Sequence, residues 1–126
     1  MGHGRQAMNR IRWDNLTAAR RSHAAGGASA GAGPLEAFFE ISARCNLRCT
    51  MCAINRDTRY DPSAGRPALM EPEIFGRLAP AFPTLLRAYL FGLGEPLMNP
   101  HLPEFARRLS ETGVEVWFNT NATLID

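Results

Sequence analysis

The chain has 126 residues, of which 45% are hydrophobic and 21% charged, so it can form one small domain with a modest core. Its formal net charge of +2 gives no reason to expect nucleic acid or an anionic membrane surface as a partner. No apolar run approaches the ~20 residues that span a bilayer, and no apolar segment follows the first arginines as a secretory signal requires.

Residues 1–34 are expected to form a flexible lead-in to the folded domain. Ala, Gly and Ser make up nearly all of His23–Pro34, which leaves little to bury and makes ordering costly in entropy. The preceding segment, Arg10–Arg21, has the spacing of one short helix, and its basic residues are interpreted as a solvated tail. The apolar side chains of that helix are Ile11, Trp13 and Leu16.

The folded part is predicted to cover residues 35–126 and to begin with a strand over Leu35–Ser42, which is aromatic and in part β-branched. A cysteine-containing segment follows directly. The polar stretch Arg56–Ala68 is expected to be a loop, because proline and glycine interrupt it. These residues are Pro62, Gly65 and Pro67.

A helix is predicted to begin near Glu71, since Pro72 suits a first-turn position and the acidic residues there complement the positive helix end. Its apolar side chains recur at helical spacing, and later prolines limit its length. The apolar positions are Ile74, Phe75, Leu78 and Phe82, and the prolines are Pro80 and Pro83.

The second half of the chain repeats this alternation. Leu85–Phe91 is predicted to be a strand, and Leu102–Thr112 a helix that Gly113 ends. Val114–Phe118 alternates apolar and other residues as a third strand does. The next helix is expected to begin at Leu124 and Ile125.

The order β-α-β-α-β predicts an α/β fold with a parallel sheet and right-handed crossovers. Functional loops of such sheets lie at the carboxyl ends of the strands. Three segments with unusual residues follow predicted strands: Cys45–Cys52, Gly92–Pro96 and Asn119–Ala122. Three strands alone leave a sheet edge open and part of a core unburied. We therefore expect this chain to be the front part of a longer protein, or a truncated or misannotated gene product.

Cys45, Cys49 and Cys52 are the only cysteines and form a C-x3-C-x2-C run. An odd, clustered set without a signal peptide indicates the reducing cytoplasm and metal ligation rather than disulfides. A 4Fe–4S cube normally takes four thiolates, so three would leave one iron without a protein ligand and open to a small molecule.

Other readings of the cysteines are a zinc site, structural thiols without a metal, or three thiolates joined by a distant histidine. Zinc usually takes four ligands, commonly from C-x2-C pairs, whereas this run supplies three cysteines. The histidines that could complete a site are His3, His23 and His101. The iron–sulfur cluster is the favoured interpretation.

The spacing Cys45-x3-Cys49-x2-Cys52 after a first strand resembles the signature of the radical S-adenosylmethionine (radical SAM) enzymes. The resemblance implies that the cysteines bind three irons of a 4Fe–4S cluster and that SAM chelates the fourth. It further implies that the reduced cluster cleaves SAM to a 5′-deoxyadenosyl radical, which abstracts hydrogen from a substrate. In such an enzyme the protein supplies ligation, orientation and exclusion of water.

Two more motifs match this family in order. Gly92-Leu93-Gly94-Glu95-Pro96 is similar to the GGEP motif after the second strand, with Leu93 in place of a glycine. The resemblance implies that this loop contacts the SAM amino group through Glu95 and backbone carbonyls.

The third motif, Asn119–Leu124, resembles a TNG-T-L pattern and implies SAM contacts from Thr120 and Asn121. Ala122 stands where the family usually has glycine, which is favoured where φ is positive. The turn is therefore expected to be shifted. Met51 stands before the last cysteine, where the family often has an aromatic residue against adenine. Its thioether suits either that contact or plain packing.

The resemblance covers residues 35–126 and implies the amino-terminal half of a radical SAM core, a partial parallel (β/α) barrel truncated after the third strand. The cysteine run is also similar to the branch that often carries a C-terminal SPASM domain and modifies peptides or proteins. The sequence does not identify the substrate, which is left open among peptides, proteins and small molecules, and it singles out no catalytic side chain. An external electron donor such as flavodoxin or ferredoxin is expected.

Two alternatives stay open: an electron-transfer iron–sulfur protein, which would normally supply all four ligands, and a non-catalytic cluster-binding remnant. Arg44 and Arg48 flank the cysteines and either offset the charge of a cluster and of SAM or serve loop solubility. Glu36 and Glu40 share a strand face with Phe38, and either line a barrel interior or lie exposed at an edge.

Overall fold

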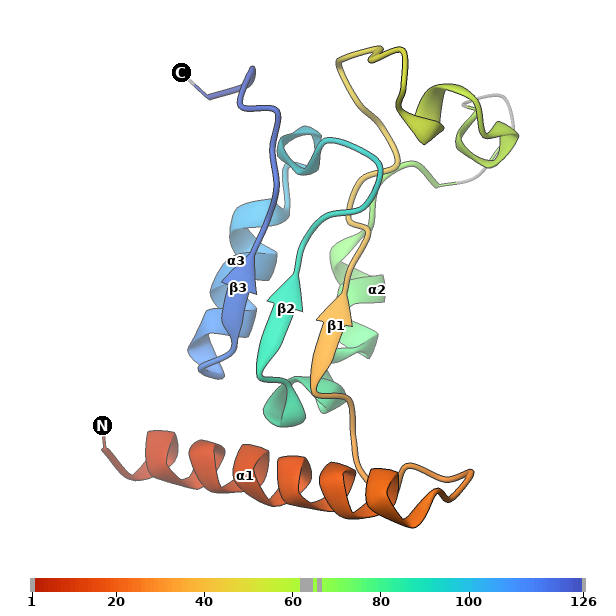
Figure 1. The fold of residues 1–126 in the computed structure, drawn as a ribbon. Helices are drawn as coiled ribbons and strands as arrows, with labels where there is room; N and C mark the ends of the chain where they lie inside the picture. The colour runs from red at the N-terminus through yellow and green to blue at the C-terminus, as the bar shows by residue number, and fades with distance from the viewer. Residues whose placement is uncertain (1, 62–64, 66, 126) are drawn as a thin grey trace.

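The computed structural model describes residues 2–61, 65 and 67–125. Its sheet has three strands in the order β1-β2-β3: β1 is Glu36–Phe38, β2 is Arg87–Tyr89 and β3 is Glu115–Trp117. Both pairings are parallel, with Phe38, Tyr89 and Trp117 in register across the sheet. Helices alternate with the strands, so the predicted α/β fold of a partial barrel is confirmed (Figure 1).

Each strand lies inside its predicted range but is shorter. Extended backbone continues past the paired residues, as Phe39 N–H donates to Tyr89 O over 2.8 Å and Leu90 N–H to Trp117 O over 2.8 Å. The strands then diverge into loops, so the regular ladder ends early. The three sequence motifs lie in the loops that follow these strand ends.

The two crossover helices begin where the sequence predicts. α2, Pro72–Arg77, has Pro72 in its first turn, and α3, Leu102–Glu111, ends just before Gly113, whose φ is +78°. The predicted first helix does not continue to Phe82 as an α-helix. After α2 the chain tightens into the 3₁₀ segment η4, Ala79–Thr84, because prolines at this point cannot donate the next helical hydrogen bonds.

One face of the sheet carries the core. α2 and α3 cover this face (Figure 1), and the rings of Phe75 and Phe105 stack with centroids 4.2 Å apart. No described helix covers the opposite face: Phe38 is 66% exposed and stacks on Tyr89 at 4.4 Å, and Arg87 pairs with acidic residues on both neighbouring strands. The core residues are Phe39, Ile41, Phe75, Phe82, Leu85, Ala88, Leu90, Leu102, Phe105, Leu109 and Val114.

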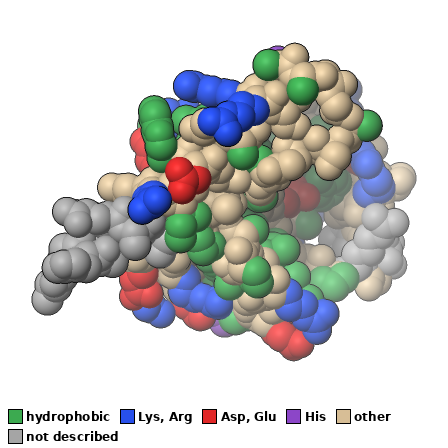
Figure 2. Space-filling view, turned by 90° about the horizontal axis from the view of Figure 1, so that it is seen from below, with side chains coloured by type: hydrophobic (Ala, Val, Ile, Leu, Met, Phe, Trp, Pro, Cys, Tyr) green, Lys and Arg blue, Asp and Glu red, His purple; other side chains and the backbone are tan. Residues whose placement is uncertain are grey.

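The lead-in contains the predicted helix over Arg10–Arg21 in a longer form, and its flexibility stays a prediction. Residues Gly2–Ala25 form one helix, α1, which runs beneath the amino ends of the strands and packs on η4 (Figure 1). Figure 2, seen from the side of α1, shows positive and negative side chains intermixed over this face. None of the described helices combines the length and apolarity that a membrane crossing needs.

Polar contacts join α1 to the rest of the chain, and the apolar pattern of the helix does not predict them. Trp13, an expected apolar point, is 64% exposed, whereas Arg12 is buried. Arg12 donates to Leu85 O over 2.6 Å and to Thr112 O over 2.5 Å, and burial lowers the pKa of its guanidinium. Asn15 pairs with the backbone of Gly33 over 2.8 and 3.1 Å. Interpreting Arg12 as part of a solvated tail is therefore wrong, because it satisfies carbonyls at the ends of other elements.

Candidate functional site

The three loops that follow β1, β2 and β3 meet at one end of the sheet. Glu95 N–H donates to Arg44 O over 2.7 Å, which joins the second loop to the residue before the first cysteine. Asn46 donates to Thr123 Oγ1 over 2.7 Å and accepts from Asn121 over 3.0 Å, which joins the first loop to the third. The structure therefore brings together the three motifs that the sequence singled out.

The three cysteines all carry free thiols in the first loop; Cys45 and Cys52 are half-buried and Cys49 is exposed. Backbone hydrogen bonds shape the loop, with Cys52 N–H donating to Cys49 O over 3.1 Å. Asn55 Nδ2 donates to the same carbonyl over 2.9 Å. The short 3₁₀ turn η1, Ala53–Asn55, thus begins directly after the last cysteine, and its Asn55 side chain binds back to the cysteine loop.

Cys45 has two N–H groups near its sulfur. Leu47 N–H donates to Cys45 Sγ over 3.4 Å, and Asn121 Nδ2 lies 3.9 Å from the same atom. Hydrogen bonds to sulfur are one means by which proteins tune iron–sulfur clusters. The donor set therefore fits a thiolate-bound cluster.

Among the residues that the structure describes, no three Cys, His, Asp or Glu side chains are gathered closely enough to hold one metal ion. A single ion requires all its sulfur ligands at about 2.3 Å, whereas in a cube each thiolate binds a different iron. His101, a possible extra ligand, lies at the start of α3 with Nε2 3.9 Å from Glu71 Oε2. The interpretation of the three cysteines as cluster ligands thus rests on their shared loop, on their free thiols and on the N–H groups beside Cys45.

Glu95 is the central carboxylate of the site and is 3% exposed. It accepts hydrogen bonds from Thr120 Oγ1 over 2.6 Å, Asn121 N–H over 2.8 Å and Leu97 N–H over 3.0 Å. Burial alone would raise the pKa of Glu95, but these three donors outweigh it and lower the pKa below its usual value. The carboxylate therefore ties the second loop to the third, and its contact with a SAM amino group stays a prediction.

Two glycines in the second loop allow close contacts that no other residue would. A Cβ on Gly94 would overlap the backbone carbonyls of Ser42 and Arg44, and one on Gly92 would overlap the carboxylate of Glu40. Pro96 follows, fully buried, as the first residue of the 3₁₀ turn η5, Pro96–Met98. The loop therefore packs closely against the segment that leads to the cysteines, and this packing requires its glycines.

The third loop makes the turn that its sequence left in doubt. Ala122 has φ +59°, and among the described residues it is the only one other than glycine with a positive φ. Ala122 N–H donates to Thr120 Oγ1 over 3.0 Å, and Thr123 N–H to Asn121 Oδ1 over 3.0 Å. Alanine here adopts the left-handed conformation that glycine would favour, and the expectation of a shifted turn stays a prediction.

Met51 is 90% exposed, so plain packing within the described chain does not explain it. Its contact with an adenine ring stays a prediction. Thr120 and Asn121 are also predicted to contact SAM. In the structure the Thr120 hydroxyl and the Asn121 backbone N–H both donate to the Glu95 carboxylate. The roles of all these residues toward SAM therefore stay predictions, while their gathering at one place is observed.

A cavity of about 600 Å³ lies beside the cysteine loop. Its walls come from residues 43–45, 47 and 48, from residues 54–61 and from Pro67, Ala68 and Met98, and they include four arginines and two aspartates. The predicted loop Arg56–Ala68 supplies one wall and contains a 3₁₀ turn, η2, Thr58–Tyr60; Pro62 lies outside the described residues. Arg44 and Arg48 are exposed cavity residues on the cysteine side.

Sequence reasoning missed two polar residues that hold this end of the sheet. Asn99, 1% exposed, donates to Ile41 O over 2.6 Å and to Met70 O over 3.0 Å, and accepts from His101 N–H over 2.9 Å. Tyr60 donates to Glu40. An asparagine directly before Pro100 at a helix start is the one local signal that could have found Asn99.

Comparison with known proteins supports the cluster-binding interpretation. The family model described as the radical SAM superfamily matches residues 39–126. This range begins within the extended segment after β1 and includes all three loops of the site.

One curated relative is the tungsten-containing aldehyde ferredoxin oxidoreductase cofactor-modifying protein of Pyrococcus furiosus, 32% identical over 91 residues. The alignment covers 70% of this chain and 24% of that relative. The chain thus spans about a quarter of the length of the relative it matches.

Proposed function

The chain belongs to the radical SAM superfamily, and from this premise we propose that it supplies the cluster-binding and SAM-binding part of a radical SAM enzyme. The observation that carries the proposal is the meeting of three strand-end loops around a run of three free thiols. Members of this family generally use a 4Fe–4S cluster and SAM.

Cys45, Cys49 and Cys52 would ligate three irons of the cluster, and the fourth iron would be left for SAM. When bound and reduced by an external donor, the cluster would supply the electron for reductive cleavage of SAM into methionine and a 5′-deoxyadenosyl group that takes hydrogen from the substrate. The protein's part is to bind, orient and shield these groups. The N–H groups of Leu47 and Asn121 would lie beside the sulfur of Cys45 in such a site.

The loop after β2 would orient the amino end of SAM. Its shape is fixed from both sides, by Glu95 N–H on Arg44 O and by the Glu95 carboxylate on the loop after β3. The backbone carbonyls of Gly92–Pro96 can accept from an ammonium group, and Met51 can cover an adenine ring. Because the loop is held before any ligand arrives, little ordering entropy has to be lost on binding.

The substrate is proposed as a peptide, a protein or a small molecule. The Pyrococcus relative is named for modifying a cofactor of another enzyme, and its likeness to this chain supports a small-molecule substrate over the peptide substrates of SPASM-type enzymes. An external one-electron donor of the flavodoxin or ferredoxin type would reduce the cluster. A reducing compartment such as the cytoplasm suits three free thiols.

A second candidate, a cluster-binding remnant without catalysis, is favoured by one observation. The sheet face opposite the helices is uncovered, with Phe38 66% and Trp117 51% exposed. A radical would need this face to be closed, so the chain as described would require further protein around its site.

The two candidates separate in one experiment. The chain is reconstituted anaerobically with iron and sulfide, given SAM and dithionite, and assayed for 5′-deoxyadenosine beside the Cys49→Ser variant. Product from the wild type alone would support catalysis. A cluster without SAM cleavage would support the remnant, and failure to hold iron, with stoichiometric zinc instead, would overturn both.

A further inference from the structure

Glu40 follows the first strand toward the cysteines and is exposed, as are Glu36 and Phe38 at alternate positions before it. Its carboxylate accepts from two segments that are far apart in sequence. Leu93 N–H, in the loop after β2, donates to Glu40 Oε1 over 2.9 Å, and the Tyr60 hydroxyl lies 3.1 Å from each carboxylate oxygen. Glu40 is therefore the meeting point of the Gly92–Pro96 loop and η2.

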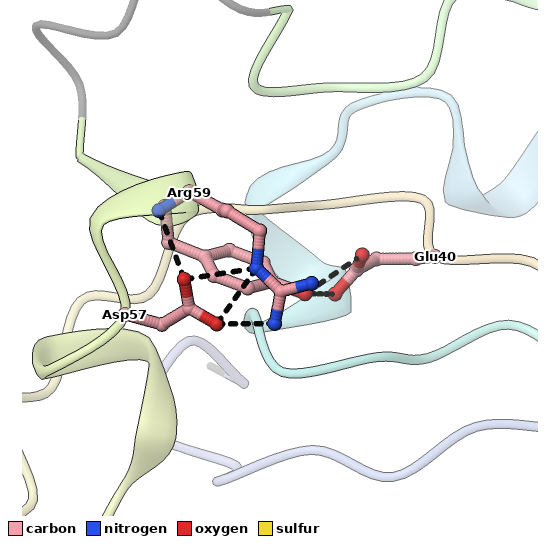
Figure 3. Close-up of polar contacts among 4 residues, drawn as sticks. Glu40, Asp57 and Arg59 are labelled. Carbon is pink, nitrogen blue, oxygen red and sulfur yellow. Dashed lines mark hydrogen bonds and ion pairs between the residues drawn. The ribbon is translucent and has the colours of Figure 1, made fainter.

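The turn that presents Tyr60 is braced by its own ion pair. Asp57 accepts from Arg59 N–H over 2.9 Å as a helix cap, and the Arg59 guanidinium binds the same carboxylate, with Nε 3.0 Å from both oxygens (Figure 3). Figure 3 shows the Asp57–Arg59 pair on one segment of the chain and Glu40 on another segment that faces it. Tyr60 thus reaches Glu40 from a preformed turn.

The same segment is anchored to the cysteine loop at its other end. Asn55 Nδ2 donates to Cys49 O over 2.9 Å, and the Arg56 guanidinium donates to Thr50 O over 3.1 Å. Hydrogen bonds therefore run without interruption from the cysteine loop through η1 and η2 to Glu40, and from Glu40 to Leu93.

Two further observations indicate that the contact is built into the site. Gly92 packs so closely on Glu40 that an added Cβ would overlap its carboxylate, so the side chain has a defined place. Burial and the hydrogen bond to Glu40 raise the pKa of Tyr60, so its hydroxyl stays a proton donor at neutral pH. Tyr60 also lines the cavity beside the cysteine loop.

We propose that Glu40 and Tyr60 are positioning residues that fix the cysteine loop relative to the Gly92–Pro96 loop, and thereby set the affinity for SAM. The proposal rests on the proposed function, because it assigns the two loops to one cofactor pair. Glu95 joins the second loop to the third, and Glu40 joins the second to the first. Two carboxylates thus hold all three loops before any ligand binds.

The test compares Glu40→Ala, Glu40→Gln and Tyr60→Phe with the matched control Glu36→Gln, which changes a carboxylate on the same strand and face but away from the loops. Hydrogen exchange of the chain without cofactors is followed over residues 53–61 and 90–98. Glu40→Ala should speed exchange of both segments about five- to tenfold, and Tyr60→Phe only that of the first. Glu40→Gln keeps an acceptor oxygen and should largely restore protection, whereas Glu36→Gln should leave both segments unchanged.

SAM affinity of the reconstituted protein is then measured by titration of the cluster's EPR signal. Glu40→Ala and Tyr60→Phe should each weaken SAM binding at least about fivefold, with near wild-type affinity in Glu40→Gln and Glu36→Gln. If the wild type binds SAM and these variants match the control in exchange or in affinity, the positioning role is overturned and the proposed function stands. If the wild type binds neither iron nor SAM, the proposed function falls and this inference falls with it.

Discussion

The hydroxyl of Thr120 donates to the buried carboxylate of Glu95 over 2.6 Å, which joins the loop after β3 to the loop after β2. Asn121 N–H adds a second donor from the same loop over 2.8 Å. Because parallel strands place their carboxyl ends along one edge, short contacts of this kind convert three separate loops into one site. Glu95 therefore has a structural role whether or not a ligand is bound.

Removing the Thr120 hydroxyl should destabilise the chain. Thr120→Val keeps the shape of the side chain but leaves the buried carboxylate with one donor fewer, so the free energy of unfolding should fall by about 1–2 kcal/mol. Thr58→Val changes an exposed threonine of η2 and should cost less than about 0.5 kcal/mol. Urea unfolding followed by circular dichroism measures both, and equal values for the two variants would show that the Thr120–Glu95 bond adds nothing.

The stability of the chain should depend on the ionisation of Glu95 at acid pH. Its pKa is lowered in the folded chain, so its contribution is present above the unfolded value of about 4.5 and is lost as pH falls through the lower folded value. Glu95→Gln lacks this titration. Wild type should exceed the variant in stability at pH 7, and the difference should shrink as pH falls below about 4.5. A difference that stays constant from pH 7 to pH 3 would contradict the role given to the carboxylate.

Adding a methyl group at the two glycines of the second loop should have unequal effects. Gly94→Ala would strike the backbone of Ser42 and Arg44, which cannot move aside, and should cost about 4 kcal/mol or prevent folding. Gly92→Ala would displace the flexible Glu40 side chain and should cost about 1–2 kcal/mol. Gly27→Ala, where an added Cβ meets only open space or ordinary contact, is the control and should be near neutral. Thermal unfolding of the three variants ranks them, and a milder Gly94→Ala than Gly92→Ala would refute the close approach.

Replacing Ala122 by glycine should stabilise the chain. Ala122 has φ +59°, a conformation that costs about 1 kcal/mol for a residue with a Cβ, and glycine removes most of that cost. The greater freedom of glycine in the unfolded chain offsets part of the gain, so we expect a net increase of about 0.5 kcal/mol. Ala18→Gly within α1 should instead lower stability by up to about 1 kcal/mol. A loss of stability in Ala122→Gly would show that the turn is not strained.

The strongest local patterns in the sequence predict the structure correctly. The helix predicted over Leu102–Thr112 is α3, Leu102–Glu111, because its apolar face and the terminal Gly113 act within a few residues of each other. The meeting of the three loops also followed from topology alone, since the order of strands and helices decides which ends lie together.

What the sequence did not reveal depends on contacts between distant residues. Arg12 looks in sequence like the other arginines of the lead-in, yet it is buried against carbonyls some 73 and 100 residues away along the chain. Tyr60 and Glu40 are 20 residues apart, and no periodicity links them. Their roles become visible only when the fold has placed their partners, because a polar side chain carries no local sign of which distant group it will bind.

Whether one iron of a cluster on this chain is open to SAM is tested most directly by EPR spectroscopy of the anaerobically reconstituted and reduced protein, with and without SAM. We predict about four irons and four sulfides per chain, a signal that changes when SAM is added, and loss of that signal in Cys45→Ser. A complete cluster whose signal is unaffected by SAM, or a chain that binds zinc in place of iron, would contradict the assignment of the three cysteines.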